Sequence, residues 1–295
     1  MNCVLIGRGY WGKILEKYIN QSKCFDLVGV YTRSTSAFSY EEFLKSVVAD
    51  AVFICSPVSS HYEHVKYALM QGKHVFCEKP FVNSIAESDE LYGLAREKNL
   101  CLYVDYIYAC SPSILKLVDI MPRIGKVQKV EFEMTQMGKF YADCDVLGNI
   151  GVHMLTAMGV VLGVDGCISE LDAEHLYVSQ AGMKLDSLYR FKYKGIPVSM
   201  RISIVSLDKM RKIFVFGKNG IVKFDMMADK TIQCVLFNLD SNGVKNAQYL
   251  EDSFDETNNL MTAVEKFHGS IIRPNFDNVK LSRFVERTRD QMKNK

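Results

Sequence analysis

The sequence predicts an α/β protein with a doubly wound parallel sheet in its first part, followed by an α+β domain with a large, mostly antiparallel open sheet. The chain opens on a short apolar run that leads at once into a G-x-G-x-x-G motif at residues 7–12. Apolar runs then alternate with amphipathic stretches as far as Val104, which is typical of parallel strands joined by right-handed crossovers. From about Lys126, strand-like runs follow one another without intervening helices, which favours antiparallel pairing.

The glycine motif predicts a dinucleotide-binding turn of the Rossmann type. Gly7 allows a tight turn off a buried strand, Gly9 lets the backbone approach a pyrophosphate, and Gly12 lets the next helix pack closely. The helix that opens near Tyr10 and Trp11 directs unpaired N–H groups at the phosphates. A strand before the motif and a helix after it make this interpretation specific.

Periodicity predicts the other elements of the first part. Strands are expected at residues 27–31, 51–54, 74–76 and 100–104, and helices at 62–70 and 85–98. Ser84 and Glu87 have the spacing of a capping box at the start of the second helix. The gap between the second and third strands is only about 20 residues, so the crossover helix there is expected to be cut down.

The second part reads as a sheet interrupted by one helix at about residues 147–162. Its strands are expected at 127–134, 176–180, 187–193, 198–204, 212–216, 221–224 and 232–236. Turns at Lys194-Gly195 and Asn219-Gly220 separate several of them, and helices at about 255–272 and 278–293 close the chain. We therefore expect a dinucleotide-binding domain at 1–120 and a substrate and oligomerisation domain at 121–295, with the option that the last helix packs back on the first domain.

Composition is that of a soluble globular protein and argues against several function classes. Of the 295 residues, 48% are hydrophobic and 24% charged, and the net charge of +2 does not favour nucleic acid. The basic stretch 283–295 contains Glu286 and Asp290, so it is interpreted as a solvated helix face. The longest mostly apolar segment, 150–164, is too short to span a bilayer. Nine cysteines without a C-x-x-C pair predict free thiols in the cytoplasm, and neither a secretory signal nor a metal site is expected.

The end of the second expected strand bears on the choice of coenzyme. A carboxylate about 20 residues beyond the glycine motif would accept the ribose 2′-OH of NAD, but the chain has Thr32, Arg33 and Ser34 there. Hydroxyls and a guanidinium suit a 2′-phosphate, so NADP is preferred over NAD. The alternative is that Arg33 extends into solvent and NAD binds through backbone contacts.

Ligands of open parallel sheets bind beyond the carboxyl ends of the strands, and three residue clusters occupy such ends here. They are Cys55-Ser56-Pro57 with His61, Glu78-Lys79-Pro80, and Asp105-Tyr106. A lysine at a strand end beside a nicotinamide can hold or protonate a substrate oxygen, which singles out Lys79. The alternative for Lys79 alone is an ordinary surface lysine.

These clusters, together with the glycine motif and a later Gly-x-His, resemble the Gfo/Idh/MocA family of NAD(P)-dependent sugar and cyclitol oxidoreductases. The resemblance covers nearly the whole chain. The matching phrases are Val52-Phe53-Ile54-Cys55-Ser56-Pro57, Gly72-Lys73-His74-Val75-Phe76-Cys77-Glu78-Lys79-Pro80, Asp145 to His153, and Ala263-Val264-Glu265-Lys266-Phe267. The resemblance implies a nicotinamide coenzyme and a sugar-like substrate.

The resemblance also implies roles for single residues. Lys79 contacts the substrate oxygen at the reacting carbon, Pro80 is a cis proline, and His153 acts as acid/base or orienting group. Tyr141, followed by Asp145 and the Gly-x-His helix, looks most like family members that act on nucleotide-linked sugars. Tyr106 at the exit of the fifth strand is expected on the substrate side.

The chain departs from the family pattern at two positions. Asn149 stands where the family has an Asp four residues before the histidine; an amide hydrogen-bonds a sugar hydroxyl but cannot exchange a proton at ordinary pH. Ala109 replaces an arginine that many relatives carry. One possibility is that His153 and Lys79 transfer the proton alone, with Tyr141 or Asp145 as candidates to replace the missing Asp. The other is that the reaction is lost. The plain alternative for His153 is a buried, satisfied histidine.

The sequence therefore predicts an NADP-preferring oxidoreductase, with NAD as the alternative coenzyme, that moves a hydride between the nicotinamide and a sugar, nucleotide-sugar or polyol. A homodimer or homotetramer is expected through the second sheet, since an exposed apolar sheet face is rarely left to water. Two rival functions remain. One is a redox-silent dinucleotide-binding sensor, and the other is a glycosidase that recycles its nicotinamide.

Overall fold

The computed structural model describes residues 1–34, 36–240 and 243–295, and the chain divides into two compact units. The first unit comprises Met1–Cys110 and Asn258–Glu286, and the second comprises Ser111–Thr257 and Arg287–Lys295. The division thus differs from the sequence-based boundary after residue 120. Helix α5 (Pro112–Ile120) belongs to the second unit because it packs on strands β11 and β12, whereas α7 (Asn259–Ile272) belongs to the first because it packs beside α1.

The first unit is a five-stranded parallel sheet in the order β2-β1-β3-β4-β5. Its strands are β1 (Asn2–Ile6), β2 (Asp26–Tyr31), β3 (Ala51–Ile54), β4 (His74–Cys77) and β5 (Leu102–Val104). The order reverses beside β1, because the chain goes first to β2 on one side and then to β3 on the other. Such a switch point is where open parallel sheets bind ligands, so the predicted doubly wound sheet is confirmed.

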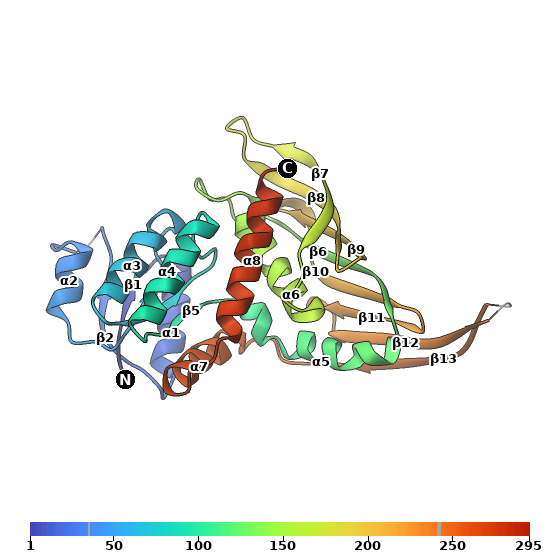
Figure 1. Cartoon of the computed structure of the whole chain (residues 1–295), viewed down its shortest axis with the longest axis horizontal. Coiled ribbons are helices and arrows are strands. Elements are labelled where there is room, and N and C mark those ends of the chain that lie inside the picture. Colours follow the sequence, from blue (N-terminus) through green and yellow to red (C-terminus); the bar gives the residue numbers. More distant parts are fainter. Residues whose placement is uncertain (35, 241–242) are drawn as a thin grey trace. The chain divides into compact units, whose positions relative to one another are not determined.

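Helices cover both faces of this sheet (Figure 1). They are α1 (Tyr10–Gln21), α2 (Tyr40–Ser46), α3 (His61–Met70), α4 (Ile85–Glu97) and α7, with short 3-10 turns at Val58–Ser60 and Ile107–Cys110. Under α1 and α7, Phe53 on β3 packs against Phe25 and Phe267 with ring centroids 5.1 and 5.5 Å apart. The capping box of Ser84 and Glu87 is present, and α2 is the expected short crossover.

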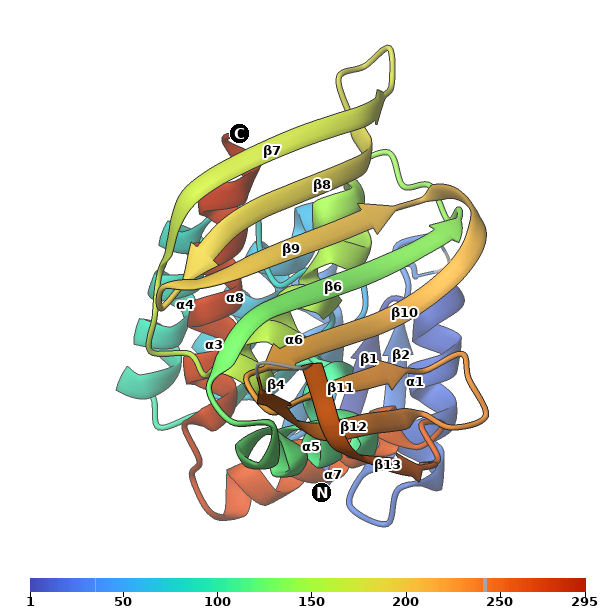
Figure 2. The same ribbon diagram turned by 90° about the vertical axis from the view of Figure 1, so that its right-hand side faces the viewer.

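The second unit is an eight-stranded sheet in the order β13-β12-β11-β10-β6-β9-β8-β7, in which only β6 and β9 pair in parallel. The strands are β6 (Val127–Met137), β7 (Ile168–Val178), β8 (Lys184–Tyr193), β9 (Ile196–Ser203), β10 (Val205–Gly217), β11 (Gly220–Asp225), β12 (Ile232–Asp240) and β13 (Gly243–Asp252). Figure 2 looks onto its open face; α5 and α6 (Val152–Leu162) lie on the other face.

The remaining helices are the 3-10 turn Met121–Ile124, a π-helical turn Leu147–Gly151 ahead of α6, and α8 (Asp277–Lys293), which runs from the first unit into the second. The predicted turns are confirmed: Lys194 and Gly195 both have positive φ, and the Asn219-Gly220 turn joins β10 to β11. Strand β13 and helix α5 are not among the sequence-based elements.

The open face of the second sheet, expected from the sequence to be apolar, carries ion pairs over four strands and an apolar row over the other four. Across β7, β8, β9 and β6 it carries ion pairs: Arg190–Asp172, Arg190–Glu174, Lys192–Glu170 and Arg201–Glu133. Across β10 to β13 a row of paired positions is apolar, namely Phe216, Ile221, Val235 and Tyr249. Buried neighbours such as Val215 and Val222 point the opposite way, into the core.

Candidate functional site

The glycine turn of the first unit has the shape that a dinucleotide requires. Gly7 has φ +93°, and a Cβ there would lie 2.5 Å from the carbonyl oxygen of Cys55. A Cβ on Gly12 would lie 2.2 Å from the carbonyl oxygen of Gly7, so this glycine lets α1 start directly against the turn. A Cβ on Gly9 would meet nothing within 4 Å. The protein itself therefore needs no glycine at position 9, whereas a group approaching the turn from outside does.

The start of α1 is available to an anion. Gly9 is its N-cap, no side chain caps it, and the first turn contains no acidic residue. Tyr10 and Trp11 are 61% and 40% exposed at this end, with their rings edge to face at 5.3 Å. The N-terminal N–H groups of a helix and the positive end of its dipole stabilise a phosphate in such a position.

The end of β2 carries the residues predicted to choose the coenzyme. Tyr31 is buried, and Thr32, Arg33 and Ser34 follow it toward solvent, with Arg33 and Ser34 exposed. Among the described residues, no carboxylate forms an ion pair with Arg33. The backbone N–H of Gly7 donates to the Tyr31 carbonyl at 2.8 Å, which holds the glycine turn beside this strand end.

The loop after β3 is fixed by two histidines. The Ser56 hydroxyl and His64 Nδ1 are hydrogen-bonded at 3.0 Å, and burial lowers the pKa of His64 to about 4, so this ring is neutral at pH 7. His61 is 1% exposed; its Nε2 lies 2.8 Å from the Ser56 carbonyl oxygen, and its Nδ1 lies 3.0 Å from that of Pro80.

His61 therefore ties the loop after β3 to the loop after β4. Both ring nitrogens lie within hydrogen-bond distance of backbone carbonyl oxygens in these two loops. The expectation that His61 binds the coenzyme directly stays a prediction. The contribution of His61 is to hold the Cys55-Ser56-Pro57 loop and the cis Lys79–Pro80 peptide in position.

Two carboxyl groups meet at the ends of β4 and β5. Cys77 and Val104 are paired in register, so Glu78 and Asp105 leave adjacent strands side by side. They are 8% and 2% exposed, and Glu78 Oε2 accepts a hydrogen bond from the backbone N–H of Lys79 at 3.1 Å. Burial raises the pKa of both groups, and Lys79 opposes that rise. Lys79 itself is half-buried at the same edge.

Tyr106 does not have the substrate-facing position that the sequence predicts. It is 2% exposed, and its hydroxyl lies 3.2 Å from Glu286 Oε1 and 3.3 Å from the Ser282 hydroxyl, both on α8. Its role is to fasten α8 to the end of β5. Glu286 is 1% exposed, so the interpretation of residues 283–295 as a solvated face is also wrong there. A buried Glu in a basic helix gave no sequence signal.

In the second unit, Asn149 and His153 occupy successive turns where the π-helical turn meets α6. They are 7% and 8% exposed. Asn149 Nδ2 donates to the Lys139 carbonyl oxygen at 2.8 Å, so the amide also holds the segment between β6 and the helix. The predicted single helix is therefore split into a π-helical turn and an α-helix, a local irregularity that often accompanies functional sites.

The other residues considered near this helix have distinct positions. Asp145 Oδ1 accepts from the backbone N–H of Gly148 at 2.9 Å, which makes Asp145 a cap of the π-helical turn. This confirms the helix-start interpretation rather than the proton-transfer one. Tyr141 is 36% exposed and lies in the segment that leads to the turn.

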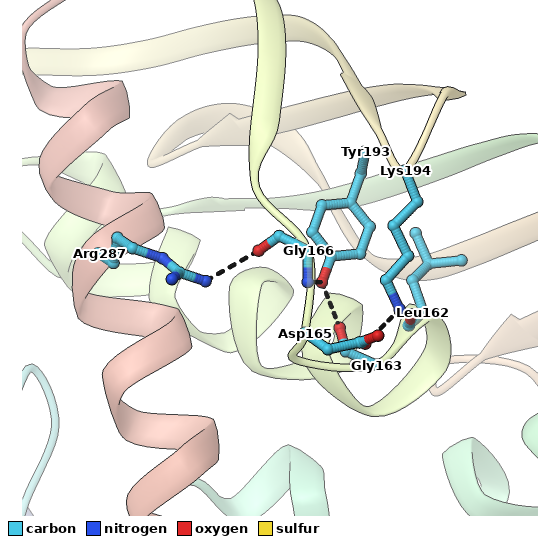
Figure 3. Close-up of polar contacts among 7 residues, drawn as sticks. All are labelled: Leu162, Gly163, Asp165, Gly166, Tyr193, Lys194 and Arg287. Atoms are coloured by element: carbon cyan, nitrogen blue, oxygen red, sulfur yellow. Dashed lines mark hydrogen bonds and ion pairs between the residues drawn. The ribbon is translucent and has the colours of Figure 1, made fainter.

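The far end of α6 is fastened by the polar cluster in Figure 3. The Tyr193 hydroxyl donates to the Gly163 carbonyl at 2.6 Å and accepts from the Gly166 N–H at 2.9 Å. Lys194 Nζ bonds the Leu162 carbonyl and pairs with Asp165, and Arg287 donates to the Gly166 carbonyl at 2.8 Å. These bonds fix the C-terminal end of α6, the helix that carries His153.

Residues 1–106 match the family model described as an oxidoreductase family with an NAD-binding Rossmann fold. The chain is 30% identical over 151 residues to the uncharacterized oxidoreductase YgjR of Escherichia coli strain K12. This match covers 46% of each protein. This chain is also 29% identical over 136 residues to a dTDP-3,4-didehydro-2,6-dideoxy-alpha-D-glucose 3-reductase of Actinomadura kijaniata. That match covers 43% of this chain and 41% of the reductase. The chain thus spans less than half the length of these relatives.

Similarity over the whole chain comes from solved structures. UDP-N-acetylglucosamine 3-dehydrogenase of Acidithiobacillus ferrooxidans superposes with a TM-score of 0.83 at 22% identity, covering 99% of this chain and 96% of that one. A 3-ketoreductase of Actinomadura kijaniata, in complex with NADP and TDP-benzene, has a TM-score of 0.82 at 17% identity, covering 100% of this chain and 97% of that one. At these identities the likeness shows the fold. Within the described ranges, no helix of this chain has the length and apolarity to cross a membrane.

Proposed function

We propose that this chain, whose residues 1–106 match the model of an oxidoreductase family with an NAD-binding Rossmann fold, transfers a hydride between a nicotinamide coenzyme and a carbinol or ketone carbon of a sugar. The observation that carries the proposal is the arrangement of the first unit. The glycine turn follows β1 and Lys79 follows β4, at the same carboxyl edge of one parallel sheet. A coenzyme bound at this edge comes within reach of a lysine that can exchange a proton.

The coenzyme is NADP in this proposal, with NAD as the alternative. Gly9 and the start of α1 hold the pyrophosphate, while Thr32, Arg33 and Ser34 receive the adenosine ribose and its 2′-phosphate. The loop of Cys55, Ser56 and Pro57, fixed by His61 and His64, lines the next strand end. When bound, the coenzyme supplies or accepts the hydride, and the chain's own residues manage the proton.

Lys79 holds the proton that balances the hydride. In the reducing direction its ammonium group donates to the oxygen of the substrate carbonyl as that oxygen becomes a hydroxyl, and in the oxidising direction its amine accepts the proton. Lys79 is half-buried, and its backbone N–H is bonded to Glu78. His153 and Asn149 of the second unit are the groups proposed to orient the sugar, through an imidazole nitrogen and an amide.

A nucleotide-linked sugar is the proposed substrate class. Two similar proteins carry names that specify such substrates, one a dTDP-sugar 3-reductase and the other a UDP-N-acetylglucosamine 3-dehydrogenase. Tyr141, 36% exposed ahead of the Asn149 turn, is proposed to contact this substrate.

The test is turnover with a panel of nucleotide sugars and their 3-keto forms, followed by NADPH absorbance. We expect Lys79→Ala to lower kcat by about a hundredfold or more with NADPH affinity retained, because the proton donor is lost while the coenzyme site stays intact. Lys98→Ala, at an exposed position that caps α4, is the matched control and should behave like wild type. Unchanged turnover in Lys79→Ala would remove this lysine from the reaction.

A redox-silent coenzyme-binding protein is the second candidate, and Asn149 is the observation that favours it. The Asn149 amide cannot take a proton, and it is engaged with the Lys139 carbonyl. Tight NADPH binding without turnover in wild type, together with turnover in Asn149→Asp, would favour this candidate. Turnover by wild type would reject it.

We further propose that the protein is a homo-oligomer, dimer or tetramer, through the open face of the second sheet. The apolar row of Phe216, Ile221, Val235 and Tyr249 is the part of that face that gains most from leaving water. Light scattering of wild type and Tyr249→Glu measures the mass. A monomeric mass for wild type at micromolar concentration would reject this proposal.

A further inference from the structure

The carboxyl groups of Glu78 and Asp105 are not accounted for by the proposed chemistry. They lie at the ends of adjacent strands, and both are more than nine-tenths buried. Asp105 Oδ1 is fully buried and has no hydrogen-bond partner. A proton on one of two neighbouring carboxyl groups supplies the donor that such an oxygen lacks, because an ionised carboxylate only accepts.

We propose that Glu78 and Asp105 share one proton at neutral pH and so present a single negative charge to Lys79. Two ionised carboxylates side by side in a buried site would repel each other, and the buried Asp105 Oδ1 would face its charged neighbour without a donor. One shared proton removes that repulsion and leaves one charge to balance the lysine ammonium group.

The surroundings of the pair support this charge state. Lys79 acts on the pair from the next position along the chain. The other titratable groups near the pair, on which its charge acts, are Cys55 after β3 and Cys77, Tyr103 and Cys110 around β4 and β5, with Glu286 near Cys77. Of these, only Lys79 brings a positive charge. Burial raises the pKa of Asp105 well above its ordinary value, and the neighbouring Glu78 raises it further.

The consequence for the reaction rests on the proposed function. With one proton in the pair, Lys79 faces one negative charge and can release its own proton to a substrate oxygen. Loss of the shared proton at higher pH adds a second negative charge beside the lysine. Glu78 and Asp105 are thus positioning residues that act through Lys79.

The proposal is tested on the full chain without coenzyme. Infrared spectroscopy at pH 7 should detect a protonated carboxylic acid whose carbonyl band shifts in deuterium oxide. Asp105→Asn should lose that band, because the amide replaces the protonated partner and Glu78 stays ionised. Asp50→Asn, which removes an exposed carboxylate of the same unit, should keep it. No such band in wild type, or a band unchanged in Asp105→Asn, would overturn the proposal; Glu78→Gln serves if Asp105→Asn does not fold.

A second readout is the pH dependence of stability. A group that keeps its proton only in the folded state makes the folding equilibrium constant fall by up to tenfold per pH unit above the unfolded pKa. Wild type should show this fall relative to Asp105→Asn above about pH 4, and parallel curves would contradict the shared proton. Neither readout needs turnover. An acid band in a protein that never oxidises NADPH would reject the proposed function and support the shared proton. Turnover in a protein without the band would support the proposed function and reject the shared proton.

Discussion

Alanine substitutions at two glycines of the same turn should have opposite consequences. A Cβ at position 9 meets nothing within 4 Å, and the backbone there, with φ −69° and ψ −160°, suits any residue. Gly9→Ala should therefore cost at most about 1 kcal/mol, the usual difference between Gly and Ala at an N-cap. A Cβ at position 12 would lie 2.2 Å from the carbonyl oxygen of Gly7, which is backbone and cannot rotate away.

Coenzyme affinity separates the two variants further. In Gly9→Ala the new methyl group holds the pyrophosphate away from the helix N-terminus. The loss of one charge-assisted hydrogen bond, worth about 1.5–3 kcal/mol, corresponds to about a 10- to 100-fold weaker Kd. In Gly12→Ala the forced movement of the turn should cost about 2 kcal/mol or more of folding free energy, as in overpacked cores.

The assay is a thermal melt of each variant together with a fluorescence titration with NADPH. Gly9→Ala should melt within a few degrees of wild type and bind NADPH poorly, whereas Gly12→Ala should melt clearly earlier. A Gly9→Ala protein that binds NADPH with wild-type affinity would refute the reasoning, because the open space at Gly9 would then serve no ligand.

Three further substitutions test other parts of the structure. Arg33→Ala should weaken NADPH more than NADH, by about tenfold or more, since only the 2′-phosphate uses the guanidinium; equal effects in paired titrations would contradict NADP selection. Tyr106→Phe should lower the free energy of unfolding, measured in urea, by about 1–3 kcal/mol, because Glu286 loses a buried hydrogen-bond donor. Tyr10→Phe, at an exposed position, should leave that free energy unchanged. Equal stabilities of Tyr106→Phe and wild type would reject the anchoring role. In the folded protein His64 is neutral at pH 7, because its pKa is lowered to about 4. Wild type should therefore lose stability relative to His64→Gln as the pH falls from about 6.5 toward 4, by less than about 1.4 kcal/mol per pH unit because the ring is partly exposed. A stability difference that does not change with pH would contradict the buried neutral ring.

The sequence was sufficient for the fold because its signals were local and periodic. The glycine motif, the Ser84 capping box and the Asn219-Gly220 turn each depend on a few neighbouring residues, and each is present in the structure. The division into two units did not follow from local sequence signals. Helix α5 joins the second unit through its packing on β11 and β12, which no short pattern encodes.

The positions of some site residues also followed from local sequence signals, and those of others did not. The expected glycines and Lys79 lie at the predicted sheet edge, since strand ends follow from strand positions. The contacts of His61 with the Pro80 carbonyl and of Tyr106 with Glu286 did not follow from the sequence, because these partners are distant along the chain. A buried polar side chain looks the same in a sequence whether it faces a ligand or a carbonyl. Asp105 is informative only once Glu78 is seen beside it.

Calorimetric titration of the wild-type chain with NADPH, and separately with NADH, tests the central claim most directly. We expect one coenzyme bound per chain with measurable heat, and tighter binding of NADPH. If neither coenzyme produced heat at concentrations up to millimolar, the turn at Gly7, Gly9 and Gly12 would not be a dinucleotide site, and the account of this protein as an oxidoreductase would be contradicted.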